Sequence, residues 1–151
     1  MQLSIISASS EVLKAEKFEK IVLMTEAGQI TILPGHEPLL SAIKPGVLSV
    51  DYYIGGKLHS TEYVTGGGVL TIAPSECMIV ADVVAADDTL SDIDYIENQK
   101  KEAALLVAAY KAENGTVIDP RKLIDLENDL LRYTAMHELG KKYHENGNSR
   151  R

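Results

Sequence analysis

The sequence has few aromatic residues and almost no cysteine. Trp is absent, aromatic residues make up 5% of the 151 residues, and Cys77 is the single cysteine. A packed core must therefore come from aliphatic side chains, and a disulfide within the chain is excluded. Because Cys77 lies in an alternating, strand-like run without a nearby histidine or basic residue, we expect a buried core thiol and not a nucleophile.

Positive charge is scarce in the first part of the chain. No Arg precedes Arg121, and residues Met1–Asp88 carry five Lys against eleven Asp and Glu, a net charge of -6. The remaining residues are nearly balanced at -1, and the whole chain carries -7. Because contacts with phosphate need clustered Lys and Arg, this distribution argues against nucleic-acid binding. The change in charge balance predicts two modules with different partners.

Long apolar runs are also missing. The N-terminal residues Met1–Ser7 have neither a basic region nor a long apolar stretch, and no later segment is apolar enough for a membrane span. We therefore expect a soluble chain without a signal peptide, which meets a membrane only through its partners.

The first half of the chain carries strand signals. Short runs rich in β-branched or aromatic residues predict strands at Lys20–Thr25, Ile30–Leu33, Val47–Tyr53, Ser60–Val64, Val69–Ile72 and Met78–Val83. Gly55-Gly56 predicts a tight hairpin turn, and Gly66–Gly68 predicts a further turn. Many short strands separated by Gly and Pro turns indicate a β-sandwich or barrel.

The period of the apolar residues changes near Asp87. Apolar residues then recur at helical spacing up to Tyr110, with Thr89 or Ser91 as the expected N-cap. A second helix is predicted by Asp119-Pro120, an N-cap followed by Pro at the first helical position. Two helices joined by a short turn form an antiparallel hairpin.

These signals divide the chain into three parts. We expect a β-sandwich at residues 1–86, a helical hairpin at 87–144 and a polar tail at 145–151.

The most distinctive segment is Gly28–Gly46. Pro34 and Pro38 restrict the backbone and Gly35 allows a turn, so the Pro-Gly-His-Glu-Pro corner is expected to be rigid. A rigid corner without an evident catalytic group suits a docking surface better than an active site. The segment follows the pattern G-x-x-x-I-x-P-G-H-x-P-L-L-x-x-I-x-P-G, and in this it resembles the epsilon subunit of F-type ATP synthases. The resemblance covers roughly Met1–Tyr143.

This resemblance implies a fold and two docking surfaces. The family has an N-terminal antiparallel β-sandwich followed by a C-terminal antiparallel hairpin of two helices. One face of the sandwich lies against the gamma subunit, and the family positions on that face are matched by Ser7, His36 and Ser41. The loop around Glu26 to Thr31 faces the membrane rotor ring, which implies that role for Glu26, Gln29 and Thr31. Gln29 stands where many relatives carry a carboxylate, which argues against a charge pair with the ring there.

The hairpin of some bacterial relatives binds ATP through an I/L-D-x-x-R-A motif. Ile93 and Asp94 fit this motif, but Glu97 replaces the Arg and Asn98 replaces the Ala, so we expect weak or no ATP binding. In relatives the hairpin can also extend along gamma and block rotation. Contacts with the catalytic alpha and beta subunits are then implied for the basic residues Arg121, Lys122, Arg132, Lys141 and Lys142. Their alternative interpretation is that of ordinary solvated helix faces.

The implied function is that of a non-catalytic rotor subunit in the central stalk. Such a subunit links the gamma shaft to the c-subunit ring of a proton- or sodium-driven ATP synthase, and its hairpin can inhibit ATP hydrolysis. No catalytic residue, metal ion or cofactor is expected. The implied location is the cytoplasmic face of the bacterial plasma membrane, with the plastid thylakoid as the alternative.

Two other interpretations of the sequence remain. A cupin-type β-barrel enzyme would use His36 and Glu37 as metal ligands, but the repeated His that such a site needs is missing. An ATP-sensing module that acts outside a synthase is disfavoured by Glu97.

Overall fold

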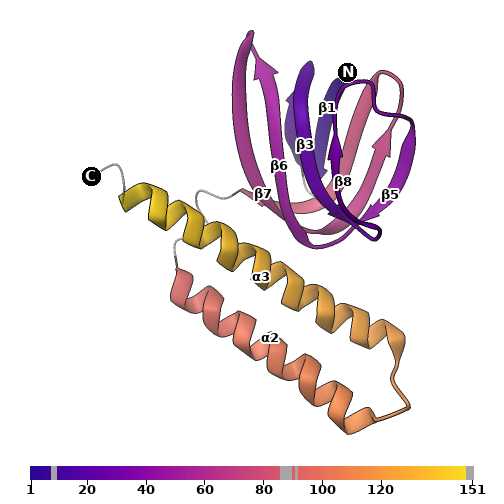
Figure 1. Ribbon diagram of the computed structural model, residues 1–151, viewed down its shortest axis with the longest axis vertical. Coiled ribbons are helices and arrows are strands. Elements are labelled where there is room, and N and C mark those ends of the chain that lie inside the picture. The colour runs from indigo at the N-terminus through magenta and orange to yellow at the C-terminus, as the bar shows by residue number, and fades with distance from the viewer. Residues whose placement is uncertain (8–9, 86–89, 91, 149–151) are drawn as a thin grey trace. The chain divides into compact units, whose positions relative to one another are not determined.

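The computed structural model describes residues 1–7, 10–85, 90 and 92–148. The chain divides into two compact units, Met1–Ala85 and Ala86–Arg151. In the described residues the first unit consists of strands that wrap around one interior, and the second consists of two helices that run side by side (Figure 1). The predicted fold class, strands followed by a helical hairpin, is confirmed.

The first unit contains strands of very different length. Their bounds are β1 Gln2–Ser7, β2 Ser10–Ala15, β3 Lys17–Thr25, β4 Gly28–Ile32, β5 Leu39–Ile43, β6 Gly46–Ile54, β7 Lys57–Ile72 and β8 Glu76–Ala85. The strands β1, β2 and β5 lie outside the segments predicted from sequence, because serine, lysine or glutamate interrupts their apolar alternation.

The longest strand, β7, connects the two layers of the sandwich. Its first half pairs with β6, and its second half pairs with β5 and β8. One layer therefore contains β4, β3, β6 and the first half of β7, and the other contains β5, the second half of β7, β8, β1 and β2. These pairs are antiparallel except β1 with β8, which is parallel.

The turn predicted at Gly66–Gly68 is wrong. These glycines lie inside β7, where the pairing with β8 shifts register between Thr65 and Gly68. A bulge of this kind bends a strand without ending it, and glycine at a bulge gives the same local sequence signal as a turn. The hairpin turn predicted at Gly55-Gly56 is confirmed, with φ values of 57° and 77°.

The core of the sandwich is aliphatic, as the composition predicts. Side chains from both layers meet in it, among them Leu3, Ile5, Phe18, Ile21, Leu23, Ile32, Leu48, Val50, Leu70, Cys77 and Ile79. Cys77 has no exposed surface, and this burial raises the pKa of its thiol from 9.0 to about 12. The predicted core thiol is therefore confirmed.

The second unit is formed by α2, Ile93–Asn114, and α3, Pro120–Asn148. The Asp92 side chain caps α2 by accepting a 3.0 Å hydrogen bond from the backbone N–H of Tyr95, and the predicted caps Thr89 and Ser91 lie outside the described residues. Asp119 caps α3 as predicted, with its Oδ1 atom 3.0 Å from the backbone nitrogen of Arg121.

The two helices are antiparallel neighbours. Lys111, near the end of α2, forms a 2.8 Å ion pair with Glu127, near the start of α3, and Ile96, Ala103 and Val107 of α2 are buried. The α3 helix continues through Asn148, so residues 145–148, expected in the polar tail, are helical. Backbone hydrogen bonds extend a helix beyond its last apolar residue, and apolar spacing therefore placed this end too early.

Candidate docking surfaces

The corner at residues 34–38 is fixed by contacts within its own backbone. The N–H of His36 donates to the backbone oxygen of Leu33 over 3.1 Å, and the His36 Nδ1 atom lies 2.8 Å from the backbone oxygen of Glu37. Gly35 has a φ of 87°, which favours glycine at this turn. The imidazole of His36 is thus held by its own loop, and the corner has a defined shape.

The described residues contain no cluster of three or more His, Cys, Asp or Glu side chains that could hold a metal ion. Within the described part of the chain, His36 and Glu37 therefore have no further ligands of the kind that a zinc-type site requires.

The outer face of β5, β7 and β8 carries several exposed aliphatic side chains. Ala42, Val69 and Val80 lie opposite one another across the three strands. Val69 and Val80 are 45% and 44% exposed, and Leu40, two residues before Ala42 on the same side of β5, is 73% exposed. Contiguous exposed aliphatic side chains on a sheet are typical of a protein–protein contact. We call Leu40, Ala42, Val69 and Val80 the outer apolar face.

The predicted gamma-facing serines do not belong to the outer apolar face. Ser41 alternates with Leu40 and Ala42, so it lies on the side of β5 that carries the buried Ile43. Ser7 lies at the end of β1 on the side of the buried Ile5. Both are partly exposed. The residues Leu39–Ile43 do not alternate between apolar and polar types, so Leu40 and Ala42 are recognised as outward residues only from the burial pattern of β5.

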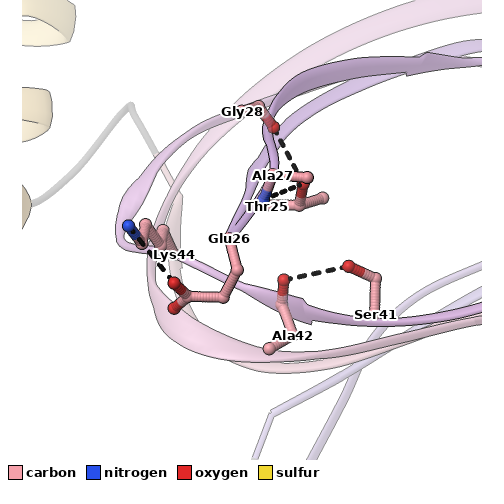
Figure 2. Close-up of polar contacts among 7 residues, drawn as sticks. All are labelled: Thr25, Glu26, Ala27, Gly28, Ser41, Ala42 and Lys44. Carbon is pink, nitrogen blue, oxygen red and sulfur yellow. Dashed lines mark hydrogen bonds and ion pairs between the residues drawn. The ribbon is translucent and has the colours of Figure 1, made fainter.

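The β3–β4 turn is closed by Thr25. Its hydroxyl donates a 2.8 Å hydrogen bond to the backbone oxygen of Gly28 and accepts a 3.2 Å bond from the N–H of Ala27, as Figure 2 shows. Thr25 itself is 2% exposed. A buried hydroxyl with both contacts satisfied fixes the conformation of the turn that carries Glu26.

Glu26 forms an ion pair with Lys44, whose Nζ atom lies 3.2 Å from the Glu26 carboxylate (Figure 2). The two backbones are also joined to neighbouring strands: the N–H of Lys44 donates to Met24 over 2.9 Å, and the N–H of Glu26 donates to Ala42 over 3.3 Å. The β3–β4 turn and the connection between β5 and β6 therefore meet at this end of the sandwich. Gln29 and Thr31 are exposed and alternate with Ile30 and the buried Ile32 of β4.

The start of α2 carries two carboxylates, those of Asp94 and Glu97. The Glu97 carboxylate forms a 3.0 Å ion pair with Lys101, and the hydrogen bond from Lys101 holds the pKa of Glu97 below its usual range. Glu97 is therefore negatively charged at neutral pH and partly neutralises the nearest lysine. Asp94, one turn earlier, is exposed and adds a second negative charge.

A cavity of about 180 Å³ lies between α2 and α3. It is lined by Gln99, Glu102, Ala103, Leu106, Leu126, Asp129 and Tyr133. Two carboxylates and no lysine or arginine line it, so its charge disfavours a nucleotide.

The five basic residues selected on the hairpin do not form one surface. Arg121 and Arg132 are exposed and lie eleven residues, about three turns, apart on one side of α3. Lys122 lies beside α2, with its Nζ atom 5.1 Å from the ring centre of Tyr110, and Lys141 is close enough to lower the pKa of Glu97. Lys142 is exposed.

Neither helix, over its described residues, contains a segment long and apolar enough to cross a membrane.

Comparison with known proteins gives one consistent family. Residues 1–87 match the family described as ATP synthase, delta/epsilon chain, beta-sandwich domain. The chain is 36% identical over 107 residues to the ATP synthase epsilon chain of Psychrobacter arcticus, covering 71% of this chain and 75% of that one. It is 29% identical over 126 residues to the ATP synthase epsilon chain of Herminiimonas arsenicoxydans, covering 78% and 88%.

The fold is also found in a solved structure. A chain in the cryo-EM structure of Euglena gracilis mitochondrial ATP synthase superposes with a TM-score of 0.65 at 24% identity, over 90% of this chain and 78% of that chain.

Proposed function

Because the chain belongs to the epsilon subunits of the F-type ATP synthase, we propose that it joins the gamma shaft to the membrane ring in the central stalk. As a member of this family it is a non-catalytic subunit. Its contribution is then mechanical: one surface of the sandwich binds gamma, another meets the c-subunit ring, and the hairpin restrains rotation.

The outer apolar face is the observation that carries the gamma contact. Leu40 is 73% exposed although it lies in a β-strand next to a fixed corner, and Val69 and Val80 continue the apolar surface across two more strands. Burial of such side chains stabilises a complex by roughly 25 cal/mol per Å² of apolar area. We assign gamma binding to this face together with His36. Ser7 and Ser41, the other residues that the family resemblance assigns to gamma, lie on the opposite side of their strands and are partly exposed there.

The β3–β4 turn is the proposed ring-facing surface. Glu26, Gln29 and Thr31 are all exposed there, and the internal bonds of Thr25 keep the turn rigid. A rigid turn transmits torque between two partners better than a mobile loop.

The hairpin is proposed to inhibit ATP hydrolysis through contacts with the alpha and beta subunits. Arg121 and Arg132 offer two cations on one side of α3, which suits an acidic partner surface. Lys122, Lys141 and Lys142 add positive charge around the same helix. The exposed side chains of α2 include the small Ala104, Ala108 and Ala109, but also Leu105 and Leu106, which are 71% and 52% exposed. The two leucines give α2 apolar area for binding a partner surface when the hairpin changes partners.

The site of action follows from these partners. The protein would be a peripheral component at the cytoplasmic face of a bacterial plasma membrane, or at the thylakoid of a plastid, and would reach the membrane through the complex alone. The driving ion is a proton or sodium.

Reconstitution tests the proposed gamma contact. The full-length chain, Leu40→Asp and Leu58→Asp would be added to an F-type catalytic complex from the same source that lacks its epsilon subunit. Leu58 is 54% exposed on the first half of β7 and serves as the matched control. We expect wild type and Leu58→Asp to bind, and Leu40→Asp to lose at least about tenfold in affinity, since a buried charge costs several kcal/mol. Absence of binding by the wild-type chain to its own gamma would contradict the proposal.

A further inference from the structure

The turn between α2 and α3 contains one of the two Asn-Gly pairs in the sequence. These pairs are Asn114-Gly115 and Asn146-Gly147. Asn114 is the last residue of α2, and Gly115 lies outside both helices with a φ of 50° and a ψ of -111°. Asn146-Gly147, in contrast, lies within α3, where helical hydrogen bonds engage the backbone N–H groups. The two pairs therefore share their chemistry but differ in backbone conformation.

An asparagine followed by glycine is open to attack by its own backbone. The backbone nitrogen of the glycine bonds to the side-chain carbonyl carbon (Cγ) of the asparagine and closes a succinimide ring, and its proton leaves with the side-chain nitrogen as ammonia. Water then opens the ring at either carbonyl, which gives aspartate or isoaspartate. Glycine favours the ring closure because it has no Cβ atom to obstruct the approach. A helical hydrogen bond that holds the glycine N–H opposes it.

The surroundings of Asn114 oppose this reaction only weakly. Gly115 is exposed, and a Cβ atom added to it would have no neighbour within 4 Å, so the turn has room to rearrange. The Asn114 Nδ2 atom donates a 2.9 Å hydrogen bond to the backbone oxygen of Tyr110. This bond is lost in the reaction, because Nδ2 is the atom that leaves as ammonia. The loss of one such hydrogen bond slows the reaction by about tenfold at most.

We propose that Asn114 is a site of spontaneous deamidation in the turn of the hairpin, with water as the only co-reactant, and that the product loosens the end of α2. This inference does not depend on the proposed function. The new carboxylate lies at the C-terminal end of α2, where the helix dipole disfavours negative charge, and next to Glu113. The amide that donates to Tyr110 is also gone. Isoaspartate, in addition, inserts a methylene group into the backbone that joins the two helices.

Peptide mapping of the full-length chain by mass spectrometry tests the site. The rate of ammonia loss would be measured at Asn114 and at Asn146 at neutral pH, in the folded chain and in urea, where neither backbone is held. We expect the folded rate at Asn114 to lie within about tenfold of its rate in urea. The corresponding ratio at Asn146 is expected to be at least about fivefold smaller. Equal ratios, or a smaller ratio at Asn114, would overturn the inference.

The nature of the product tests the chemical step. Ring opening at either carbonyl gives a mixture, so part of the product at position 114 should be isoaspartate, which enzymatic methylation detects. Aspartate alone would show direct hydrolysis of the side chain and contradict attack by Gly115. Asn114→Gln is the matched control variant, because its longer side chain closes the corresponding ring slowly. It should lose no ammonia at position 114 over the same time, while the rate at Asn146 stays unchanged.

The effect on α2 has its own measurement. Asn114→Asp supplies the charge of the product directly. Amide hydrogen exchange at residues 111–114 is expected to be about two- to fivefold faster in this variant than in the wild type, because the helix end opens more often. Exchange that is no faster would overturn the proposed loosening of α2.

Discussion

Gly68 on β7 lies so close to β8 that a Cβ atom at this position would overlap the backbone oxygen of Val80 and would lie 2.7 Å from the Cα atom of Ala81. The approach occurs where the pairing of β7 with β8 shifts register, next to the outer apolar face. Backbone contact at this place leaves no room for a side chain. The glycine therefore fixes the bend that carries β7 from one layer of the sandwich into the other.

Gly68→Ala is expected to destabilise the sandwich strongly. The methyl group meets backbone atoms, which have little freedom to move, so we expect a loss of about 3 kcal/mol or more in the free energy of unfolding. Gly28→Ala is the control, because Gly28 also has a positive φ of 116° but an added Cβ there has no neighbour within 4 Å. It is expected to cost about 1 kcal/mol through backbone strain alone. Urea unfolding followed by circular dichroism measures both, and equal losses would contradict the steric explanation.

The parts of the fold that local chemistry determines were predictable from sequence. Asp119-Pro120 predicts the start of α3 because capping and the missing N–H of proline act within one turn. Gly55-Gly56 predicts a hairpin because its two positive φ values suit this turn. The parallel pairing of β1 with β8 was not predictable in this way, since it pairs residues such as Ser4 and Met78 that are 74 positions apart.

The candidate surfaces were likewise predictable from the sequence only where local residues determine them. The prolines of the corner indicate a rigid docking feature, but its most exposed neighbour, Leu40, becomes apparent only when β5 is placed in the sheet. The pairing of Glu26 with Lys44 depends on two connections at the same end of the sandwich, and sequence spacing alone does not bring them together. The family resemblance assigned Ser7 and Ser41 to the gamma-facing side from their positions in the sequence alone. Which residues of β1 and β5 face outward is decided by the pleat of these strands.

The burial of Cys77 predicts a pH dependence of stability. Its pKa is about 12 in the folded chain against 9.0 for an ordinary thiol, so between these values the unfolded chain has lost a proton that the folded chain keeps. The contribution of the Cys77 thiol to the free energy of unfolding is complete below pH 9 and is lost as the pH rises towards 12. The slope of this loss approaches about 1.4 kcal/mol per pH unit. Cys77→Ala should lower stability at neutral pH and show a shallower decline above pH 9. Denaturant unfolding at a series of pH values measures the two slopes, and identical slopes would contradict the prediction.

ATP is expected not to bind the hairpin of the isolated chain at sub-millimolar concentration. The position that needs a cation carries Glu97, which is paired with Lys101, and the cavity between the helices is lined by Glu102 and Asp129. Isothermal titration calorimetry of the full-length chain is the measurement. Glu97→Arg replaces the carboxylate with the cation that the ATP-binding motif has at this position. Of the variants of this chain, it is the one expected to gain affinity for ATP. Sub-millimolar binding by the wild type would refute the electrostatic argument.

Reversal of the two arginines on one side of α3 is expected to relieve inhibition of ATP hydrolysis. Arg121 and Arg132 are exposed, and their side chains make no ion pair with another described residue, so their charges are available to an acidic partner. In a reconstituted complex, Arg121→Glu/Arg132→Glu should raise the hydrolysis rate about fivefold over wild type at low salt, and high salt should reduce the difference by screening. Lys14→Glu/Lys57→Glu, which changes the net charge by the same amount at two exposed positions of the sandwich, is the control and should leave the rate unchanged. An equal increase of the hydrolysis rate in both variants would show that net charge, and not the surface of α3, governs inhibition. An unchanged rate in both would assign inhibition to other residues of the hairpin.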